Sequence, residues 1–194
     1  GGADFLDINT GIQALWAGGT LNVAAGFYQE DVVCDRSMHM IGVGTDSDPN
    51  LGTVVISTGA SPPNAVITVT ANDVIIDSCR VDGTVPSGDT KIDYDIYASG
   101  VANLEVARCV MHQCGEAISY NSSTGGLFTD NEIFDFGRDP TNGGGIYLTG
   151  STGTVGQVVG FDSQGNYIHD GLSPGVILGT SSSGLVQANR IHDC

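Results

Sequence analysis

Residues 83–95 combine acids with a cation in a pattern that could bind a metal ion or a sugar. Asp93 and Asp95 are two positions apart, so on an extended segment both side chains would point to one side, as a Ca²⁺ pair requires. Lys91 adds a positive charge next to them. Two acids this close are also expected by chance in a chain with 22 acidic residues. A chance cluster is therefore the preferred interpretation, and Asp93 and Asp95 are a candidate calcium pair as the alternative.

A second stretch, residues 135–145, contains Arg138 and Asp139. Both stretches follow a short strand that begins at Asn or Cys and precede an apolar strand, so we expect them to overhang one side of the fold. Outward positions of the adjoining strands would add aromatic rings and hydroxyl groups to that side. Carboxylates, cations and rings together suit a saccharide, and the predicted binding residues are Tyr97, Ser119 and Tyr147.

Two histidines, His169 and His192, are each followed by an aspartate and are separated by 23 positions. On adjacent coils of a repeating structure their imidazole rings would stack about 5 Å apart. Stacked histidines with flanking acids can ligate a transition metal, but a repeat also places identical residues in surface ladders for packing reasons alone. A surface ladder is the preferred interpretation, and a metal site is the alternative.

The two histidines belong to a short phrase that occurs five times: Asn or Cys, any residue, then Ile, Val or Met. The shortest spacings between copies are 22 and 23 residues, and longer spacings leave room for inserted loops. An apolar residue precedes most copies by three positions, and an alternating apolar segment lies further upstream, which indicates three short strands per period. The copies begin at Cys79, Cys109, Asn131, Asn166 and Asn189.

Three short strands per period predict an all-β fold, namely a parallel β-solenoid of about seven coils. Strands of successive coils would pair, and the first position of the phrase would point inward. We therefore expect Asn131, Asn166 and Asn189 to stack, with each amide bonded to its neighbour and to the turn backbone. Cys79 and Cys109 would fill the same buried position in earlier coils.

The two ends of the single domain, residues 1–194, differ in pattern. Residues 7–16 have apolar side chains at helical spacing, which predicts a short helix that caps the first coil within residues 1–18. Residues 19–194 would form the coils, and the last of them is a copy of the repeat with no amphipathic segment after it. An uncapped coil exposes unpaired strand edges, which favours a part of a longer solenoid or end-to-end assembly of copies.

The segment after the predicted helix carries a family resemblance. Residues Gly19–Val33 and Ser37–Gly44, together with the Asn-x-Ile repeats, resemble right-handed parallel β-helix proteins of the pectin-lyase-like superfamily. The resemblance covers nearly the whole chain and implies a right-handed parallel β-helix. It does not select a function, because the superfamily includes polysaccharide lyases, hydrolases, esterases and epimerases as well as adhesins, phage spikes and structural proteins.

The resemblance also implies a possible chemistry. Pectate-lyase-like enzymes bind Ca²⁺ through clustered aspartates and use an Arg or Lys as base, because a uronate carboxylate must be neutralised before the adjacent proton is removed. By this resemblance Arg138, Lys91 and Asp139 are the candidate catalytic residues, and Asp93 and Asp95 would hold the calcium ion. Stricter signatures of alginate epimerases, polygalacturonases and pectin esterases are absent from the sequence. A calcium-assisted lyase or epimerase acting on a (poly)uronate is therefore the alternative function.

The net charge of the chain excludes some classes of binding partner. With 22 acids against 6 Lys and Arg, the formal net charge is −16, which repels nucleic acids and anionic lipids. No apolar run is long enough to cross a bilayer, so we also expect no membrane insertion. The favoured function is a non-catalytic extracellular or cell-surface module with a structural, adhesive or carbohydrate-contacting role. Its partner would be a polysaccharide or copies of the chain itself, with Ca²⁺ as the candidate cofactor.

Overall fold

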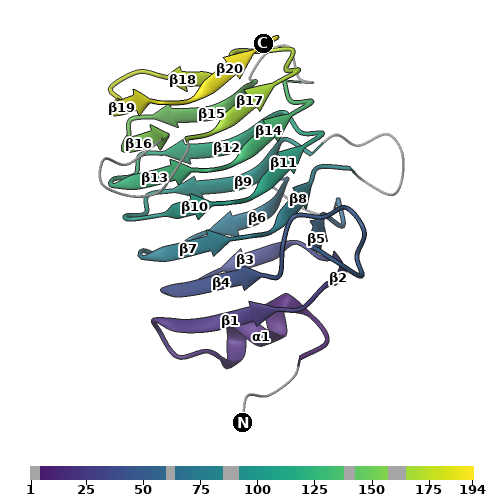
Figure 1. Ribbon diagram of the computed structural model, residues 1–194. Helices are drawn as coiled ribbons and strands as arrows, with labels where there is room; N and C mark the ends of the chain where they lie inside the picture. Colours follow the sequence, from purple (N-terminus) through teal and green to yellow (C-terminus); the bar gives the residue numbers. More distant parts are fainter. Residues whose placement is uncertain (1–4, 60–63, 85–91, 138–142, 157–164) are drawn as a thin grey trace.

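The computed structural model describes residues 5–59, 64–84, 92–137, 143–156 and 165–194. In these residues one short helix, α1 (Ile8–Ala14), is followed by strands that wind into a solenoid (Figure 1). Strands of successive coils lie side by side, and their pairings are parallel. The arrangement confirms the all-β parallel β-helix predicted from the repeat.

Three sheets run along the solenoid. Sheet 1 contains β1 (Gly19–Val23), β4 (Met38–Gly42), β7 (Val74–Asp77), β10 (Glu105–Ala107), β13 (Gly126–Thr129), β16 (Thr152–Gly156) and β19 (Ser183–Gln187). Sheet 2 contains β2 (Gly26–Gln29), β5 (Thr53–Ile56), β8 (Arg80–Asp82), β11 (Val110–His112), β14 (Glu132–Phe134), β17 (Tyr167–His169) and β20 (Arg190–His192). Sheet 3 contains β3 (Val32–Cys34), β6 (Ala65–Val69), β9 (Tyr94–Ser99), β12 (Glu116–Asn121), β15 (Gly144–Thr149) and β18 (Val176–Leu178).

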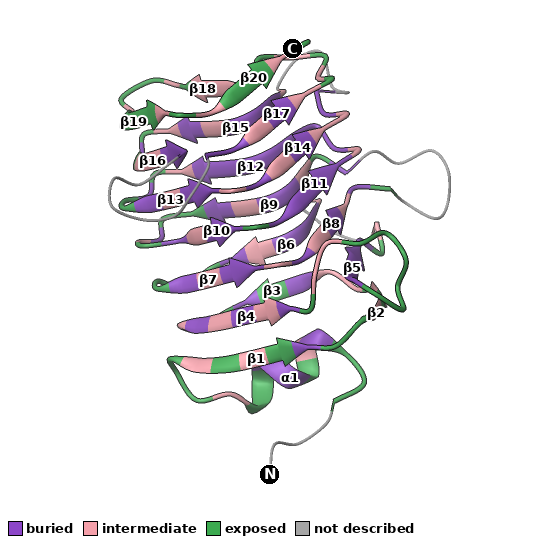
Figure 2. Ribbon diagram, viewed as in Figure 1, coloured by how far each residue is buried: buried purple, intermediate pink, exposed green. Residues whose placement is uncertain are grey.

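Columns of apolar side chains from each sheet fill the interior. In sheet 2, Val81, Met111, Ile133 and Ile168 are in register on successive coils and are all fully buried. Burying one such side chain contributes roughly 1.5–3 kcal/mol to folding. Figure 2 shows buried segments in the strands of the middle coils. Because side chains alternate along a strand, functional groups on these strands are at the outward positions.

Four connections between sheets 1 and 2 are built in the same way, namely β7–β8, β10–β11, β13–β14 and β19–β20. Ser78, Arg108, Asp130 and Ala188 each have φ between 53° and 57°. This left-handed conformation turns the chain sharply between two strands and is unfavourable for residues other than glycine. The residue that follows is in each case the first of the repeated phrase, and its hydrogen bonds offset this strain.

Asn131, Asn166 and Asn189 stack inside this corner. Asn131 Nδ2 donates to Asn166 Oδ1 at 3.0 Å, and Asn166 Nδ2 donates to Asn189 Oδ1 at 2.9 Å. The stack reaches the preceding coil through Cys109, whose main-chain N–H donates to Asn131 Oδ1 at 2.9 Å. Cys79 and Cys109 occupy the equivalent buried position in earlier coils, and each thiol donates to a main-chain carbonyl at 3.3 Å.

Helix α1 covers the first coil with the buried side chains of Ile8 and Ile12. Glu30 holds the start of the helix, because its carboxylate accepts the main-chain N–H groups of Ile8 at 2.7 Å and Asn9 at 3.0 Å. Among the described residues there is no helix with the length and apolar character needed to cross a membrane.

The last described coil continues the core columns without a layer over it. Leu178 is in register with Leu148, and Ile191 is in register with Ile168. Leu148 and Ile168 are fully buried, whereas Leu178 and Ile191 are each 43% exposed. Val186 on the same coil is 41% exposed. The described part of the chain therefore presents apolar core positions at this end.

Candidate functional site

The three residues predicted to bind a saccharide form one row across sheet 3. Tyr97 on β9, Ser119 on β12 and Tyr147 on β15 are in direct register. Both tyrosines are half-buried, and Ser119 is 2% exposed. Since paired strands lie about 4.8 Å apart, the two tyrosines are separated by about 10 Å along the solenoid. The row therefore consists of two rings with a small hydroxyl residue between them.

Among the described residues, the polar groups of this row make few hydrogen bonds. The hydroxyl groups of Tyr97 and Tyr147 make no hydrogen bond in the described part of the chain. Ser119 Oγ accepts a hydrogen bond from Asn121 Nδ2 at 3.0 Å. Tyr94 packs against Tyr97 with ring centroids 5.0 Å apart and planes at 44°. Rings with unused hydroxyls can bind a polyhydroxylated ligand by packing and hydrogen bonding together.

Glu116 adds an acid that the sequence did not single out. It begins β12, in register with Tyr94 on β9 and Gly144 on β15. The residue is 3% exposed, and its Oε2 has no hydrogen-bond partner among the described residues. Burial raises the pKa of Glu116 to about 7; a hydrogen bond from Ser119 opposes this shift, and the negative charge of Asp93 adds to it. No local motif marks this carboxyl, because the neighbours that bury it come from other coils.

Asp93 and Asp95 do not form the calcium pair expected from their spacing. Asp93 precedes β9 and is exposed, whereas Asp95 is fully buried. The alternation fails because Asp95 and Ile96 are both fully buried, so the start of β9 directs Asp95 to the interior. Burial raises the pKa of Asp95 well above its usual range, an effect that the Cys114 thiol only partly opposes. A neutral carboxyl group is a poor calcium ligand.

Three further predicted residues, Arg138, Lys91 and Asp139, lie outside the described residues. Within the described ranges, no three His, Cys, Asp or Glu side chains gather closely enough to hold a metal ion. The described part of this face therefore consists of the tyrosine row, the buried carboxyl of Glu116 and the exposed carboxylate of Asp93.

His169 and His192 stack on the outer face of sheet 2. Their ring centroids are 5.6 Å apart, with an angle of 18° between the planes. Nδ1 of each ring pairs with the carboxylate of the following aspartate, at 2.7 and 2.8 Å. Nε2 of His169 lies 3.4 Å from Glu132 Oε1, and Nε2 of His192 lies 3.0 Å from the Tyr167 hydroxyl. The ring nitrogens are thus engaged within the protein, which favours the surface ladder over the metal site.

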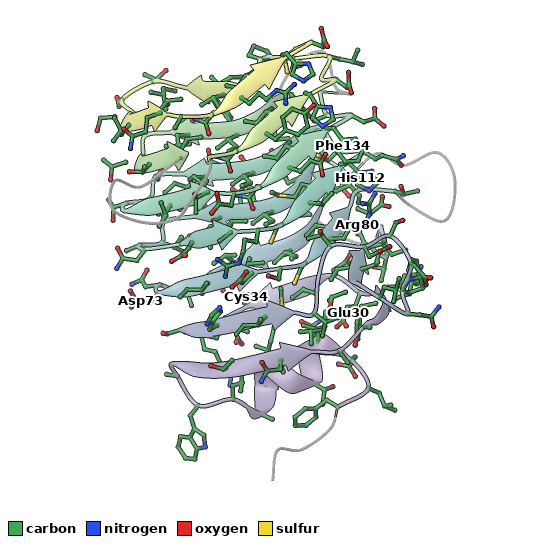
Figure 3. All side chains as sticks on the ribbon, in the orientation of Figure 1. Glu30, Cys34, Asp73, Arg80, His112 and Phe134 are labelled. Atoms are coloured by element: carbon green, nitrogen blue, oxygen red, sulfur yellow. The ribbon has the colours of Figure 1, made fainter. Side chains whose placement is uncertain are left out.

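The ring ladder continues toward earlier coils. Phe134 stacks between His112, at 4.9 Å, and His169, at 5.4 Å. Arg80 Nη2 lies 2.6 Å from His112 Nε2, and Asp82 Oδ2 lies 3.3 Å from the same nitrogen. Figure 3 shows Arg80, His112 and Phe134 one above another on one side of the solenoid. Because the rings cover one another's faces, this ladder joins the coils and offers a ligand little ring surface.

No protein-family model and no curated protein matches the sequence. Solved structures match the fold. A pectin methylesterase variant in complex with a hexasaccharide is 14% identical, with a TM-score of 0.64 over 98% of this chain and 62% of that chain. The pectin methylesterase from Aspergillus niger is 12% identical, with a TM-score of 0.58 over 95% of this chain and 72% of that chain. The enzyme of the same name from Erwinia chrysanthemi is 16% identical, with a TM-score of 0.53 over 86% and 56% of the two chains.

The chain has the parallel β-helix fold of these pectin methylesterases. The chain spans about 62% of the length of the methylesterase that holds the hexasaccharide. Identities of 12% to 16% establish the fold alone, so the activity has to be argued from the outward residues of this β-helix.

Proposed function

We propose that this protein holds a polysaccharide chain on the outer face of β9, β12 and β15. The observation that carries the proposal is the register of Tyr97, Ser119 and Tyr147, which places two half-buried rings on one side of the sheet. Rings about 10 Å apart would contact different sugar units of one chain that runs along the solenoid. The geometry therefore suits an extended polymer better than a single small sugar.

The matched structures support a carbohydrate as the class of ligand. Each of the three is a pectin methylesterase, and one of them holds a hexasaccharide. In this proposal the ligand is a polysaccharide of the same general kind, and the protein acts outside the cell or at its surface.

The charge of the protein distinguishes between polysaccharides with the same backbone. Polygalacturonate carries a carboxylate on each sugar, whereas highly methyl-esterified pectin is largely uncharged. A chain with a net charge of −16 repels the first more strongly than the second. We expect methyl-esterified pectin to bind more tightly, and added salt to reduce the difference because it screens the repulsion.

Titration calorimetry with methyl-esterified pectin tests the assignment of the face. Tyr97→Ala and Tyr147→Ala are each expected to weaken binding about tenfold, equivalent to ~1.4 kcal/mol, through loss of ring contact. Tyr97→Phe separates the contribution of the hydroxyl from that of the ring. Phe27→Ala is the matched control, because Phe27 is an aromatic residue that is 55% exposed on β2 of sheet 2. Unchanged affinity in the Tyr97→Ala/Tyr147→Ala double variant would rule out this face.

End-to-end assembly is a second candidate role, favoured by the exposed core positions Leu178, Val186 and Ile191. Light scattering over a range of protein concentrations tests it. If copies associate through this end, Ile191→Asp should abolish growth of the particles with concentration. Leu51→Asp, at a residue that is 63% exposed in the connection just before β5, should not. A particle size independent of concentration would contradict this role.

A further inference from the structure

The hydroxyl group of Tyr167 lies at the end of a chain of hydrogen bonds on the outer face of sheet 2. Tyr167 Oη is 3.0 Å from His192 Nε2, and His192 Nδ1 is 2.8 Å from Asp193 Oδ2. A hydroxyl group, an imidazole and a carboxylate in this order can activate the hydroxyl oxygen as a nucleophile for acyl transfer. We propose that Tyr167, His192 and Asp193 form an acyl-transfer site that acts on uncharged carboxylic esters. The site does not depend on saccharide binding, because the tyrosine face belongs to sheet 3.

The backbone of two neighbouring coils brings these side chains together. Tyr167 begins β17, which pairs with β20 so that His169 and His192 are in register. Asp193 directly follows β20 with φ of 53°, and in this left-handed conformation its carboxylate lies against the imidazole of the preceding residue. Asp170 has φ of 51° and pairs with His169 in the same way. The corner after sheet 2 therefore pairs a histidine with an aspartate in both coils.

The carboxylate determines which nitrogen of His192 can take up a proton. An ionised carboxylate only accepts hydrogen bonds, so the Nδ1 that faces Asp193 carries the hydrogen of the neutral ring. Nε2 is then the acceptor, and the Tyr167 hydroxyl donates to it. His169 differs, because its Nε2 lies 3.4 Å from Glu132 Oε1, and a carboxylate has no proton to give. Of the two stacked histidines, His192 is the one placed to accept a proton from a hydroxyl group.

The site is open to a substrate and carries a positive charge. The side chains of His192 and Asp193 are 37% and 75% exposed, and Tyr167 is half-buried. Arg190 is exposed, and its guanidinium carbon lies 4.9 Å from the centroid of the Tyr167 ring. A cation at this place would stabilise the negative charge that develops on an attacked carbonyl oxygen. Uncharged esters are favoured as substrates, because a net charge of −16 repels anionic ones.

The reaction uses the hydroxyl of Tyr167 as the nucleophile and His192 as the base. Tyr167 Oη forms a bond to the acyl carbon of the ester while its proton passes to His192 Nε2. The carbon–oxygen bond of the ester then breaks, and the leaving alcohol takes the proton from Nε2. Attack of water on the acyl-tyrosine, with the same proton movements, releases the carboxylic acid and restores the hydroxyl group. Asp193 is a positioning residue, because it holds the imidazole and does not touch the ester.

Hydrolysis of p-nitrophenyl acetate, followed by the release of p-nitrophenolate, tests the proposal. The parent protein carries Cys194→Ser, because the exposed thiol would itself react with the ester. Tyr167→Phe should reduce the release to the background rate, and His192→Gln should lower kcat ~100-fold through loss of the general base. His39→Gln is the matched control and should leave the rate unchanged. His39 also lies near an aspartate, with Nε2 3.6 Å from Asp77 Oδ2, but on sheet 1.

Two variants of Asp193 separate positioning from a merely structural role. Asp193→Ala frees the imidazole to rotate, so it should lower kcat and leave KM unchanged. Asp193→Asn should keep part of the lost activity, because its side-chain oxygen can still accept the Nδ1 hydrogen. A rise in KM with unchanged kcat in Asp193→Ala would contradict the positioning role.

The acyl-tyrosine itself can be detected by mass spectrometry after acid quenching. The acetyl group should be found on Tyr167 and not on Tyr97 or Tyr147, whose hydroxyls make no hydrogen bond in the described part of the chain. Three results would overturn the proposal: release that persists in Tyr167→Phe, equal rates in the parent and His192→Gln, or acetylation of the three tyrosines at equal rates. Each of these results leaves the saccharide function of sheet 3 in place.

Discussion

Asn166 Oδ1 accepts two hydrogen bonds from Asn131, one from the side-chain Nδ2 at 3.0 Å and one from the main-chain N–H at 3.1 Å. Asn166 in turn donates to the main-chain carbonyl of Phe128 at 2.9 Å. Both asparagines are 1% exposed. A single side chain thus bonds to three polar groups of the neighbouring coil, so its loss removes a hydrogen bond from each; Asn131 Nδ2 keeps its bond to the main-chain carbonyl of Val106 at 2.9 Å.

Asn166→Ala is therefore expected to lower the free energy of unfolding by roughly 2–4 kcal/mol, since each buried group left unpaired costs about 1–3 kcal/mol. Urea titration followed by circular dichroism measures the change. Asn189→Ala is the matched control, because Asn189 is only half-buried and should cost less. Equal losses in the two variants would contradict the role given to burial.

The buried carboxyl of Asp95 makes stability depend on pH. Its folded-state pKa lies above the unfolded value, so between about pH 4 and the raised pKa the native state binds more protons than the unfolded state. The contribution of Asp95 to the free energy of unfolding is fully present below the unfolded-state pKa, and it is lost as the pH rises toward the raised folded-state pKa. Asp95→Asn should therefore raise the unfolding midpoint more at pH ~7 than at pH ~4.

Thermal unfolding at the two pH values checks this expectation. Asp46→Asn, at an exposed aspartate, serves as the control and should show no such pH dependence. A stabilisation by Asp95→Asn that is the same at both pH values would show that the carboxyl group is not neutral in the folded protein.

Burial makes four of the five thiols unreactive. Cys34, Cys79, Cys109 and Cys114 are buried, and Cys194 is exposed. Burial raises the pKa of Cys34 and Cys109 to about 12, which suppresses the thiolate that reacts with disulfide reagents. One thiol per chain should react rapidly with Ellman's reagent, and all five should react after denaturation. Cys194→Ser should abolish the rapid reaction; a second fast thiol in that variant would contradict the burial.

The repeat was sufficient to predict the architecture, because equal positions of a periodic sequence must fall on equal positions of successive coils. The spacing from Asn131 to Asn166 and Asn189 predicts a stack of amides, and the hydrogen bonds join the same three residues. The register of Tyr97 with Ser119 follows from the same periodicity. Both features could be predicted because they depend only on which residues pair between neighbouring strands.

Properties that depend on burial by distant residues could not be predicted in this way. Simple alternation placed Asp93 and Asp95 on one side, but two consecutive buried residues at the start of β9 separate them. Glu116 has an ordinary sequence context, and its raised pKa comes from burial and from the charge of Asp93 on a neighbouring coil. Both properties depend on how the coils pack in the folded protein, because burial and neighbouring charges do not repeat at regular intervals along the sequence.

The left-handed corner between sheets 1 and 2 has a consequence for how such a chain can change. That corner takes residues 78–79 between β7 and β8 and residues 108–109 between β10 and β11. The return from sheet 2 to sheet 3 takes residues 113–115 in one coil and residues 83–93 in another. The number of residues in one coil can therefore vary while the spacing between successive coils stays constant. Segments of different lengths can be inserted between two sheets, at the return beside the tyrosine face and also in residues 43–52 between β4 and β5, without altering the rise from one coil to the next.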